Sequence, residues 1–234
     1  MHDDEVPIDE DLVRRLLRDQ MPQLASLPLG IVRPWGTDHA IWRLGDELVV
    51  RLPRIAWAKD QPEREARWMP VLAPHLPIAV PETVAVGEPA RDYPFRWSIQ
   101  RWLPGTGADL GADVDPAQLA GDLAEVVAAL WRIPTDDAPA ANNRARPVQE
   151  YDAAARHVIR GARDLIDADA ALELWEDALA APPHDGDPRW VQGDLEGNCL
   201  VVDGRLSAIV DWGSACAGDP AVDVQVVWSR LFTE

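Results

Sequence analysis

Three polar residues near the C-terminal end of the sequence have the chemistry that phosphoryl transfer needs. Asp194 follows an apolar run, Asn198 comes four residues later, and Asp211 ends a second apolar run. In phosphoryl transfer from ATP, one Asp accepts the proton of the attacking hydroxyl, while an Asn and a second Asp hold the metal on the phosphates. Oxygen ligands of this kind suit Mg²⁺. The spacing therefore predicts Asp194 as a base and Asn198 and Asp211 as Mg²⁺ ligands.

A β-hairpin is expected to position these residues. Apolar residues 199–202 and 206–210 flank the pair Asp203-Gly204, and an Asp-Gly pair between two such runs is a hairpin signal. Asn198 precedes the first strand and Asp211 follows the second, so both lie at the open end of the hairpin, near Asp194. A hairpin with solvated turn carboxylates is the simpler interpretation of the Asp-Gly pair taken alone.

The motifs around this hairpin resemble those of the aminoglycoside phosphotransferase family, which shares the protein-kinase-like fold. Residues 192–195, QGDL, resemble the family's HGDL loop, residues 211–213, DWG, its metal motif, and residues 218–223, GDPAVD, its GDPxxD segment. The resemblance implies that Asp223 supports the catalytic loop by bonding its backbone. Two features depart from the pattern. Gln192, the other residue that we expect to support the loop, stands in place of His, and the loop from Asp194 to Asn198 is one residue shorter than in kinases.

The N-terminal part of the chain is expected to hold the phosphates of ATP. The sequence predicts strands at residues 30–35, 40–44 and 48–52 and a helix at residues 61–72. The first turn contains Gly36 and Thr37, whose backbone could cover phosphates, although a single Gly there also fits an ordinary meander. A kinase has its phosphate-binding Lys near the end of the third strand. Here the resemblance implies Arg51, paired with Glu65 on the helix, with Glu63 as the nearest competitor and a solvated helix face as the alternative.

The adenine site is expected where the sheet leads into the second half of the chain. Strands are predicted at residues 82–87 and 96–102, just before Pro104. In the resembling family this edge becomes the linker between two lobes, and its backbone hydrogen-bonds the adenine. The linker residues implied here are Gln100, Arg101, Trp102 and Leu103. The expected domains are therefore an ATP-binding lobe at residues 1–104 and a catalytic lobe at residues 105–234.

Helical periodicity dominates the remaining sequence. Apolar residues recur at helical spacing in residues 9–20, 116–133, 148–166 and 169–179. Together with the N-terminal strands they predict an α+β, two-lobed protein-kinase-like fold, in which a small antiparallel-sheet lobe joins a mainly helical lobe. After Pro220 the residues are apolar over most of the circumference of the expected helix, which predicts either a longer enzyme or a homodimer that buries this helix.

Composition narrows the partners of the chain. Its net charge of −18 argues against binding to nucleic acid or anionic membranes. The charge permits steering of a cationic substrate, aided by acidic clusters at residues 109–115 and 164–169, although it also serves solubility alone. There is no apolar run long enough to span a membrane, no secretory signal at the N-terminus, and no disulfide framework from two cysteines. These features favour the cytoplasm.

The function that these predictions favour is an ATP- and Mg²⁺-dependent kinase that acts on a hydroxyl of a small molecule. An aminoglycoside-type antibiotic or a related polyhydroxylated, cationic compound is the acceptor that the resemblance implies. One alternative is a nucleotide-binding, kinase-like module with impaired catalysis, which Gln192 and the short loop motivate. The other is a protein kinase, which the lack of a long activation segment after Asp211 disfavours.

Overall fold

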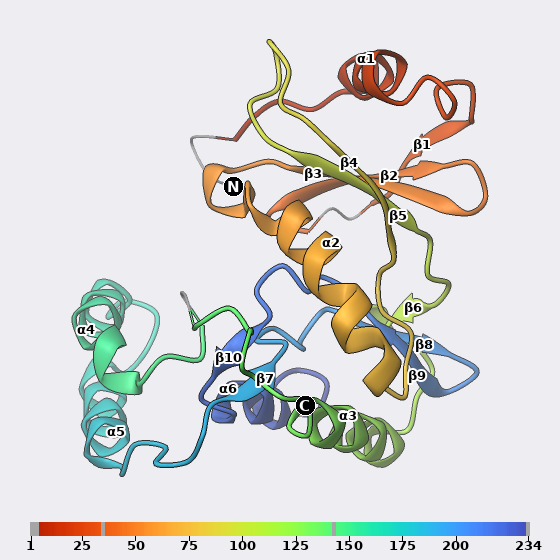
Figure 1. Cartoon of the computed structure of the whole chain (residues 1–234). Coiled ribbons are helices and arrows are strands. Elements are labelled where there is room, and N and C mark those ends of the chain that lie inside the picture. The colour runs from red at the N-terminus through yellow and green to blue at the C-terminus, as the bar shows by residue number, and fades with distance from the viewer. Residues whose placement is uncertain (1–4, 34–35, 142–143, 233–234) are drawn as a thin grey trace.

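A five-stranded antiparallel sheet forms the upper lobe of the molecule in Figure 1. The computed structural model describes residues 5–33, 36–141 and 144–232. The strands follow the order β1-β2-β3-β5-β4. Their bounds are Leu29–Ile31 (β1), His39–Leu44 (β2), Leu48–Pro53 (β3), Thr83–Gly87 (β4) and Trp97–Arg101 (β5). The first predicted strand, residues 30–35, is thus shorter than expected where it is described, and residues 34–35 lie outside the described part.

The two faces of this sheet pack differently: one covers the core under helix α1 (Glu10–Gln20) and the other faces the lower lobe. Trp42, Leu44, Val50 and Leu52 pack beneath helix α1 in a core of buried apolar side chains. Asp9 caps this helix by accepting a hydrogen bond from the N–H of Leu12 at 2.8 Å. Because side chains alternate along a strand, the intervening residues point to the other face. That second face looks into the space between the lobes.

Helix α2 (Gln61–Leu72) connects the two lobes physically, as Figure 1 shows. Glu65, in its first half, lies against the sheet, whereas Met69 and Leu72 belong to the hydrophobic core of the lower lobe. The following segment also joins that lobe, since the N–H of Ala79 donates to the carbonyl of Ser207 at 3.0 Å. The expected boundary near residue 104 therefore separates the chain less sharply than the sequence implied, because the end of α2 packs with residues of the second half.

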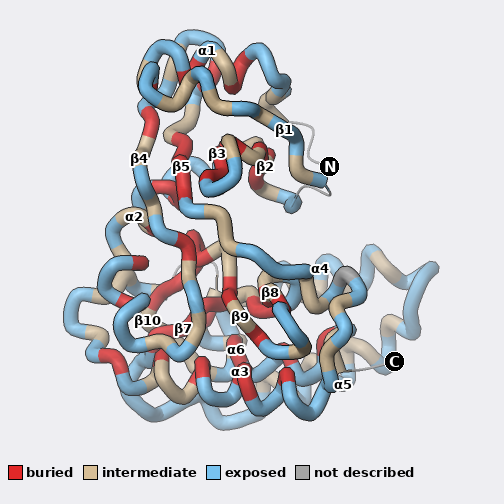
Figure 2. The backbone as a smooth tube through the Cα atoms, turned by 90° about the vertical axis from the view of Figure 1, so that its right-hand side faces the viewer, coloured by how far each residue is buried: buried red, intermediate tan, exposed pale blue. Residues whose placement is uncertain are grey.

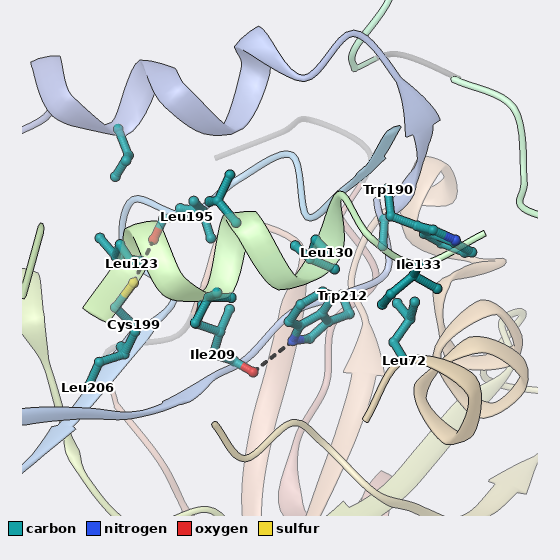
Figure 3. Close-up of a cluster of buried hydrophobic side chains, with 14 of the residues drawn as sticks. Leu72, Leu123, Leu130, Ile133, Trp190, Leu195, Cys199, Leu206, Ile209 and Trp212 are labelled. Atoms are coloured by element: carbon teal, nitrogen blue, oxygen red, sulfur yellow. Dashed lines mark hydrogen bonds between the residues drawn. The ribbon is translucent and has the colours of Figure 1, made fainter. Parts of the chain in front are cut away.

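The lower lobe is built on helix α3 (Pro116–Leu130) and two small antiparallel sheets. One sheet joins β6 (Thr106–Gly107), β8 (Cys199–Val202) and β9 (Arg205–Ile209), and the other pairs β7 (Arg189–Val191) with β10 (Cys216–Gly218). Figure 3 shows the buried cluster between them. Its labelled members include Leu123, Leu130, Trp190, Ile209 and Trp212. This core fixes the positions at which the β8–β9 hairpin starts and ends.

The predicted hairpin is present. Strands β8 and β9 pair antiparallel, and the turn between them contains Asp203 at φ 49° and Gly204 at φ 73°. Positive φ at both central residues is the backbone that a type I′ turn requires and that an Asp-Gly pair accepts readily. The turn chemistry thus brings the two ends of the hairpin, at Asn198 and Asp211, together as expected.

A helical pair stands at the left of the lower lobe in Figure 1. It consists of α4 (Asp152–Gly161) and α5 (Ala168–Ala180), and neither helix has a buried residue. Strand β5 of the upper lobe, by contrast, is mostly buried and is red in Figure 2. The helix predicted at residues 148–166 is wrong in its extent, because a 3₁₀ turn precedes α4 and the chain leaves helical geometry at Ala162.

The described 3₁₀ helices span Ala56–Ala58, Ala73–His75, Ala108–Leu110, Val148–Tyr151 and Gln225–Trp228.

The C-terminal helix is much shorter than the sequence predicts. Helix α6 covers only Ala221–Val224 and continues as a 3₁₀ helix. Val226 is buried, and Phe232 packs against the core of the lower lobe, so part of the apolar surface is already covered. Trp228 remains 75% exposed. Dimerisation through this segment stays a prediction, now with a smaller apolar surface behind it.

None of the helices within the described ranges has the length and hydropathy needed to cross a membrane.

Candidate active site

A cavity of about 510 Å³ lies between the two lobes. Its apolar lining includes Val32, Ile41, Val49, Leu103 and Leu200, from both lobes. Ten of the residues proposed from sequence also line it. They are Gly36, Thr37, Arg51, Gln100, Arg101, Trp102, Leu103, Asp194, Asn198 and Asp211. Of the three other predicted residues, Glu65 and Gln192 contact the lining residues Arg51 and Asp194. Asp223 binds the backbone of the loop that precedes Asp194.

A buried ionic network forms the wall of the cavity under the sheet. Nη1 of Arg51 lies 2.7 Å from Oε1 and 2.6 Å from Oε2 of Glu65. Nη2 of Arg51 lies 3.2 Å from Oδ1 of Asp211. The predicted pair is therefore formed with Glu65, whereas Glu63 pairs with Arg96 on the surface. A buried arginine held in this way presents its charge to the cavity at a fixed place.

Glu65 also reaches the loop that follows the hairpin. Its Oε1 accepts a hydrogen bond from the backbone N–H of Trp212 at 2.9 Å. Asp211, the preceding residue, has φ 57°, a left-handed conformation that is strained for a residue other than Gly. Burial raises the pKa of Asp211, but the charge of Arg51 and its hydrogen bond to the carboxylate lower it, and the net pKa lies below its ordinary value. The network thus holds Asp211 as a carboxylate.

The interlobe linker differs in part from the expectation. The side chain of Gln100 belongs to the buried ionic network, because its Nε2 donates to Oε2 of Glu65 at 2.6 Å. The N–H of Arg101 donates to Glu82 at 2.9 Å, and that of Trp102 donates to Glu47 at 2.8 Å. Within residues 5–33, 36–141 and 144–232, the N–H of Leu103 is the linker donor that no other group engages. Leu103 is therefore the linker residue best suited to donate to a base.

The loop at residues 192–198, the predicted catalytic loop, is held by hydrogen bonds with Asp223 and with its own residues Gln192 and Asn198. The two carboxylate oxygens of Asp223 accept the backbone N–H groups of Gln192 at 2.8 Å and Gly193 at 2.7 Å. Burial raises the pKa of Asp223 to about 6, although these two hydrogen bonds lower it. Gln192 in turn donates from Nε2 to the carbonyl of Asp211 at 2.8 Å and accepts the N–H of Asp194 at 2.6 Å. Gln192 therefore links the loop that carries Asp194 to residues 211–213, which we call the metal loop. An amide can make both contacts because it has a donor and an acceptor.

Asn198 closes the shortened loop. Its Nδ2 donates to the backbone carbonyl of Asp194 at 2.7 Å, and its own carbonyl accepts the N–H of Val210 at 2.9 Å. Because the amide nitrogen is engaged in this way, the amide oxygen is the atom that could meet a metal ion. Gly197, at φ 80°, permits the tight return of the chain before it.

The donor set fits magnesium bound together with phosphates. Mg²⁺ is usually held by one or two carboxylates, with phosphate oxygens and water completing the octahedron, and not by an all-protein cage. Asp211 and Asn198 supply oxygen donors to the same cavity. In the described part of the chain, no group of three or more His, Cys, Asp or Glu residues could bind a metal by itself.

Two residues of the site were not predicted. His39 is buried beside Arg51 and Asp211, and burial, reinforced by the Arg51 charge, lowers its pKa to about 3. It shares the strand face of Ile41, which pairs with Arg51, so the alternation of β2 was a usable signal. Arg144 contacts Asp194, with Nη2 at 3.1 Å from Oδ2. It is 50 residues away in a loop, and no periodic pattern marks it.

The fold and this cavity define a class of protein, the two-lobed, kinase-like phosphotransferases. The model of the phosphotransferase enzyme family matches residues 31–234, and the chain therefore belongs to that family. No curated relative matches the sequence.

Solved structures of phosphotransferases are similar to nearly the whole chain. APH(2")-IIia in complex with GDP and kanamycin is 19% identical, with a TM-score of 0.74, and the match covers 93% of this chain and 77% of that one. The macrolide 2'-phosphotransferase MphH from Brachybacterium faecium is 27% identical, with a TM-score of 0.62 and coverages of 94% and 76%. The streptomycin–ATP complex of APH(2")-IIa is 17% identical, with a TM-score of 0.61 and coverages of 95% and 76%.

Proposed function

We propose that this protein transfers the γ-phosphoryl group of ATP to a hydroxyl group of a small molecule. The observation that carries the proposal is the interlobe cavity, because Asp194, Asp211 and Arg51 all line it. A base, a metal ligand and a fixed cation around one space are the parts that phosphoryl transfer uses. Membership of the phosphotransferase family supports the same reaction class.

In this proposal Asp194 accepts the proton of the acceptor hydroxyl. Burial raises the pKa of Asp194, and the Arg144 charge lowers it in part, so the carboxylate is a stronger base than a solvated one. The side chain is 46% exposed, so a hydroxyl can reach it. The Asp223 and Gln192 contacts hold the loop on which it stands.

Arg51 and the linker hold the nucleotide. Arg51 lines the cavity with a guanidinium that Glu65 holds in place, and a guanidinium suits the oxygens of phosphate. Magnesium, when bound, would be held by Asp211 and by the amide oxygen of Asn198, and it would neutralise charge on the phosphates. The need for ATP fits action in the cytoplasm. Use of GTP is the variant to examine beside ATP, because the relative crystallised with kanamycin carries GDP.

The acceptor that we propose is a polyhydroxylated antibiotic-type molecule. The family relatives reported above act on or bind aminoglycosides and macrolides. The net charge of −18 and the presence of Asp109 in the cavity lining favour a cationic member of this class. Such a charge also makes nucleic acids and anionic membranes poor partners.

A turnover assay with ATP or GTP, with and without Mg²⁺, tests the proposal. The acceptors are kanamycin, streptomycin, a macrolide and simple polyhydroxylated metabolites, and mass spectrometry detects the added phosphoryl group. We expect Asp194→Ala to retain nucleotide binding and to lose turnover by about 10²–10⁴-fold, the contribution of a general base. Asp137→Ala, at an exposed turn, is the control that should match the wild type. Near-wild-type turnover of Asp194→Ala would contradict the assignment of the base.

A nucleotide-binding module with impaired catalysis is the second candidate. The observation in its favour is that both key carboxylates are paired with arginines, Asp194 with Arg144 and Asp211 with Arg51. Tight nucleotide binding by calorimetry, without transfer to any acceptor of the panel, would support this candidate over the first.

A further inference from the structure

We propose that Arg144 is the positioning residue of Asp194, an inference that rests on the proposed function. Nη1 of Arg144 donates to the carbonyl of Gly193 at 2.8 Å, and Nη2 lies 3.1 Å from Oδ2 of Asp194. The two nitrogens of one planar guanidinium therefore bind a backbone oxygen and the carboxylate of the next residue. Because the group is rigid, it fixes the direction of the carboxylate relative to the loop.

The other contacts of the loop do not fix that direction. Gln192 accepts the backbone N–H of Asp194, and Asn198 donates to its backbone carbonyl. Asp223 binds only the N–H groups of the two preceding residues. Within the part of the chain that the structure describes, Arg144 is thus the group that holds the reacting side chain itself. The remaining oxygen, Oδ1, is left for the acceptor hydroxyl.

Arg144 contacts Asp194 from outside the lining of the interlobe cavity. Asp194 lines the interlobe cavity, whereas Arg144 is not among the described residues that do. Arg51 and Asp211, on the nucleotide side, have no contact with Arg144 in the described structure. Loss of Arg144 should therefore affect the geometry of the base and leave nucleotide binding in place.

The backbone that carries Arg144 is anchored tightly. Ala145 is buried at φ 56°, and its carbonyl accepts the N–H of Asp219 at 2.9 Å. A Cβ at Gly218 would come within 2.5 Å of that carbonyl oxygen, so the close approach requires Gly. A strained φ next to a residue that contacts the base persists only where the surroundings enforce it. These contacts fix the backbone immediately after Arg144.

The test compares Arg144→Met, Arg144→Lys and a matched control, Arg146→Met. Arg146 lies on the same segment but pairs with Glu150 on the surface. The assay uses Mg²⁺-ATP and the panel acceptor that the wild type phosphorylates fastest, with calorimetry of ATP binding and a melting curve. We expect Arg144→Met to lower kcat on the order of 10- to 100-fold, as misplacement of a catalytic group by about 1 Å does. KM for the acceptor, ATP affinity and Tm should stay close to the wild type.

Arg144→Lys should have a higher kcat than Arg144→Met, because an ammonium can reach Oδ2 of Asp194. It cannot also bind the carbonyl oxygen of Gly193 in the fixed geometry of a guanidinium, so kcat should stay below that of the wild type. Arg146→Met should behave as the wild type. Unchanged kcat in Arg144→Met would overturn the inference, and so would a parallel fall of kcat, ATP affinity and Tm, which would indicate a merely structural role. If Arg144→Met does not fold, wild-type kcat in a folded Arg144→Gln variant would overturn it instead. A wild-type protein that binds ATP and phosphorylates no acceptor would refute the proposed function, which is a distinguishable result.

Discussion

At the scale of single residues, the site depends on a few atoms that hold two carboxylates. Asp211 is kept ionised by Arg51 at 3.2 Å, whereas Asp194 is held through its backbone by Gln192 and Asn198. Gln192 fills the place of a His in the resembling motif, and its amide makes both contacts that tie the two loops together. The substitution is therefore compatible with an ordered catalytic loop.

Asp211 should matter more for metal-dependent nucleotide binding than Asn198. Asp211→Asn replaces a charge with a neutral amide, which cannot offset the charge of Mg²⁺ and also weakens the pairing with Arg51. Asn198→Ala removes one neutral oxygen and the bond to the Asp194 carbonyl. Calorimetry of ATP with and without Mg²⁺ measures both effects. A larger loss in Asn198→Ala would show that the metal lies elsewhere.

Asp223 should make the fold less stable as the pH rises. Its folded pKa is about 6, above the unfolded value of about 4, so the native state binds the extra proton between these values. The stability is fully present below about pH 4 and is lost as the pH rises toward 6. Relative to Asp223→Asn, the wild type should lose roughly 2–3 kcal/mol of unfolding free energy across this window.

Urea unfolding of both proteins at several pH values gives this difference directly. The comparison with Asp223→Asn removes the contributions of the other carboxylates, which are the same in the two proteins. Parallel pH curves for the wild type and the variant would contradict the raised pKa.

At the scale of elements, the start of α2 and the metal loop (residues 211–213) approach each other closely at Gly213. A Cβ at Gly213 would lie 2.5 Å from Oε1 and 2.6 Å from Cβ of Gln61, the first residue of α2. The DWG motif therefore needs its Gly for close approach, and not for an unusual φ. Through this contact the position of α2, and of Glu65 on it, depends on the metal loop.

Gly213→Ala should lower both Tm and the affinity for Mg²⁺-ATP, because the helix must move away from the loop. Gly121 on α3 is the matched control, since a Cβ there meets nothing within 4 Å. Gly121→Ala should instead stabilise the fold by about 0.5–1 kcal/mol through helix propensity. A melting curve and ATP calorimetry distinguish the two. A Gly213→Ala protein with unchanged ATP affinity would show that the loop absorbs the extra atom.

Local chemistry explains which elements could be predicted. The β8–β9 hairpin follows from its Asp-Gly turn. The Arg51–Glu65 pair was implied by the family resemblance, since the sequence alone left Glu63 as a competitor. The predicted length of the C-terminal helix was wrong, because the helical pattern of the sequence does not reveal that Val226 and Phe232 pack against the lower core and that α6 ends after one turn. Arg144 could not be predicted, because its contact with Asp194 depends on a strained Ala145 and on packing at Gly218, which are tertiary features.

At the scale of the whole molecule, the excess of negative charge should act on the approach of the acceptor. The chain carries −18, and Asp109 lies in the lining of the cavity. If the acceptor is cationic, its kcat/KM should fall as salt rises, because screening shortens the Debye length from about 30 Å at 0.01 M to about 8 Å at 0.15 M. Rates measured with kanamycin and with an uncharged polyol compare the two cases. A salt-insensitive kcat/KM for kanamycin would exclude steering.

Helix α2 packs into both lobes, and we therefore expect the two lobes to unfold together. Its first half holds Arg51 through Glu65, and its second half places Met69 and Leu72 in the lower core. If either lobe unfolds, α2 loses its contacts there and is less well held against the other lobe. If the cavity binds a nucleotide, we expect this binding to raise the unfolding free energy of both lobes and not of the upper lobe alone.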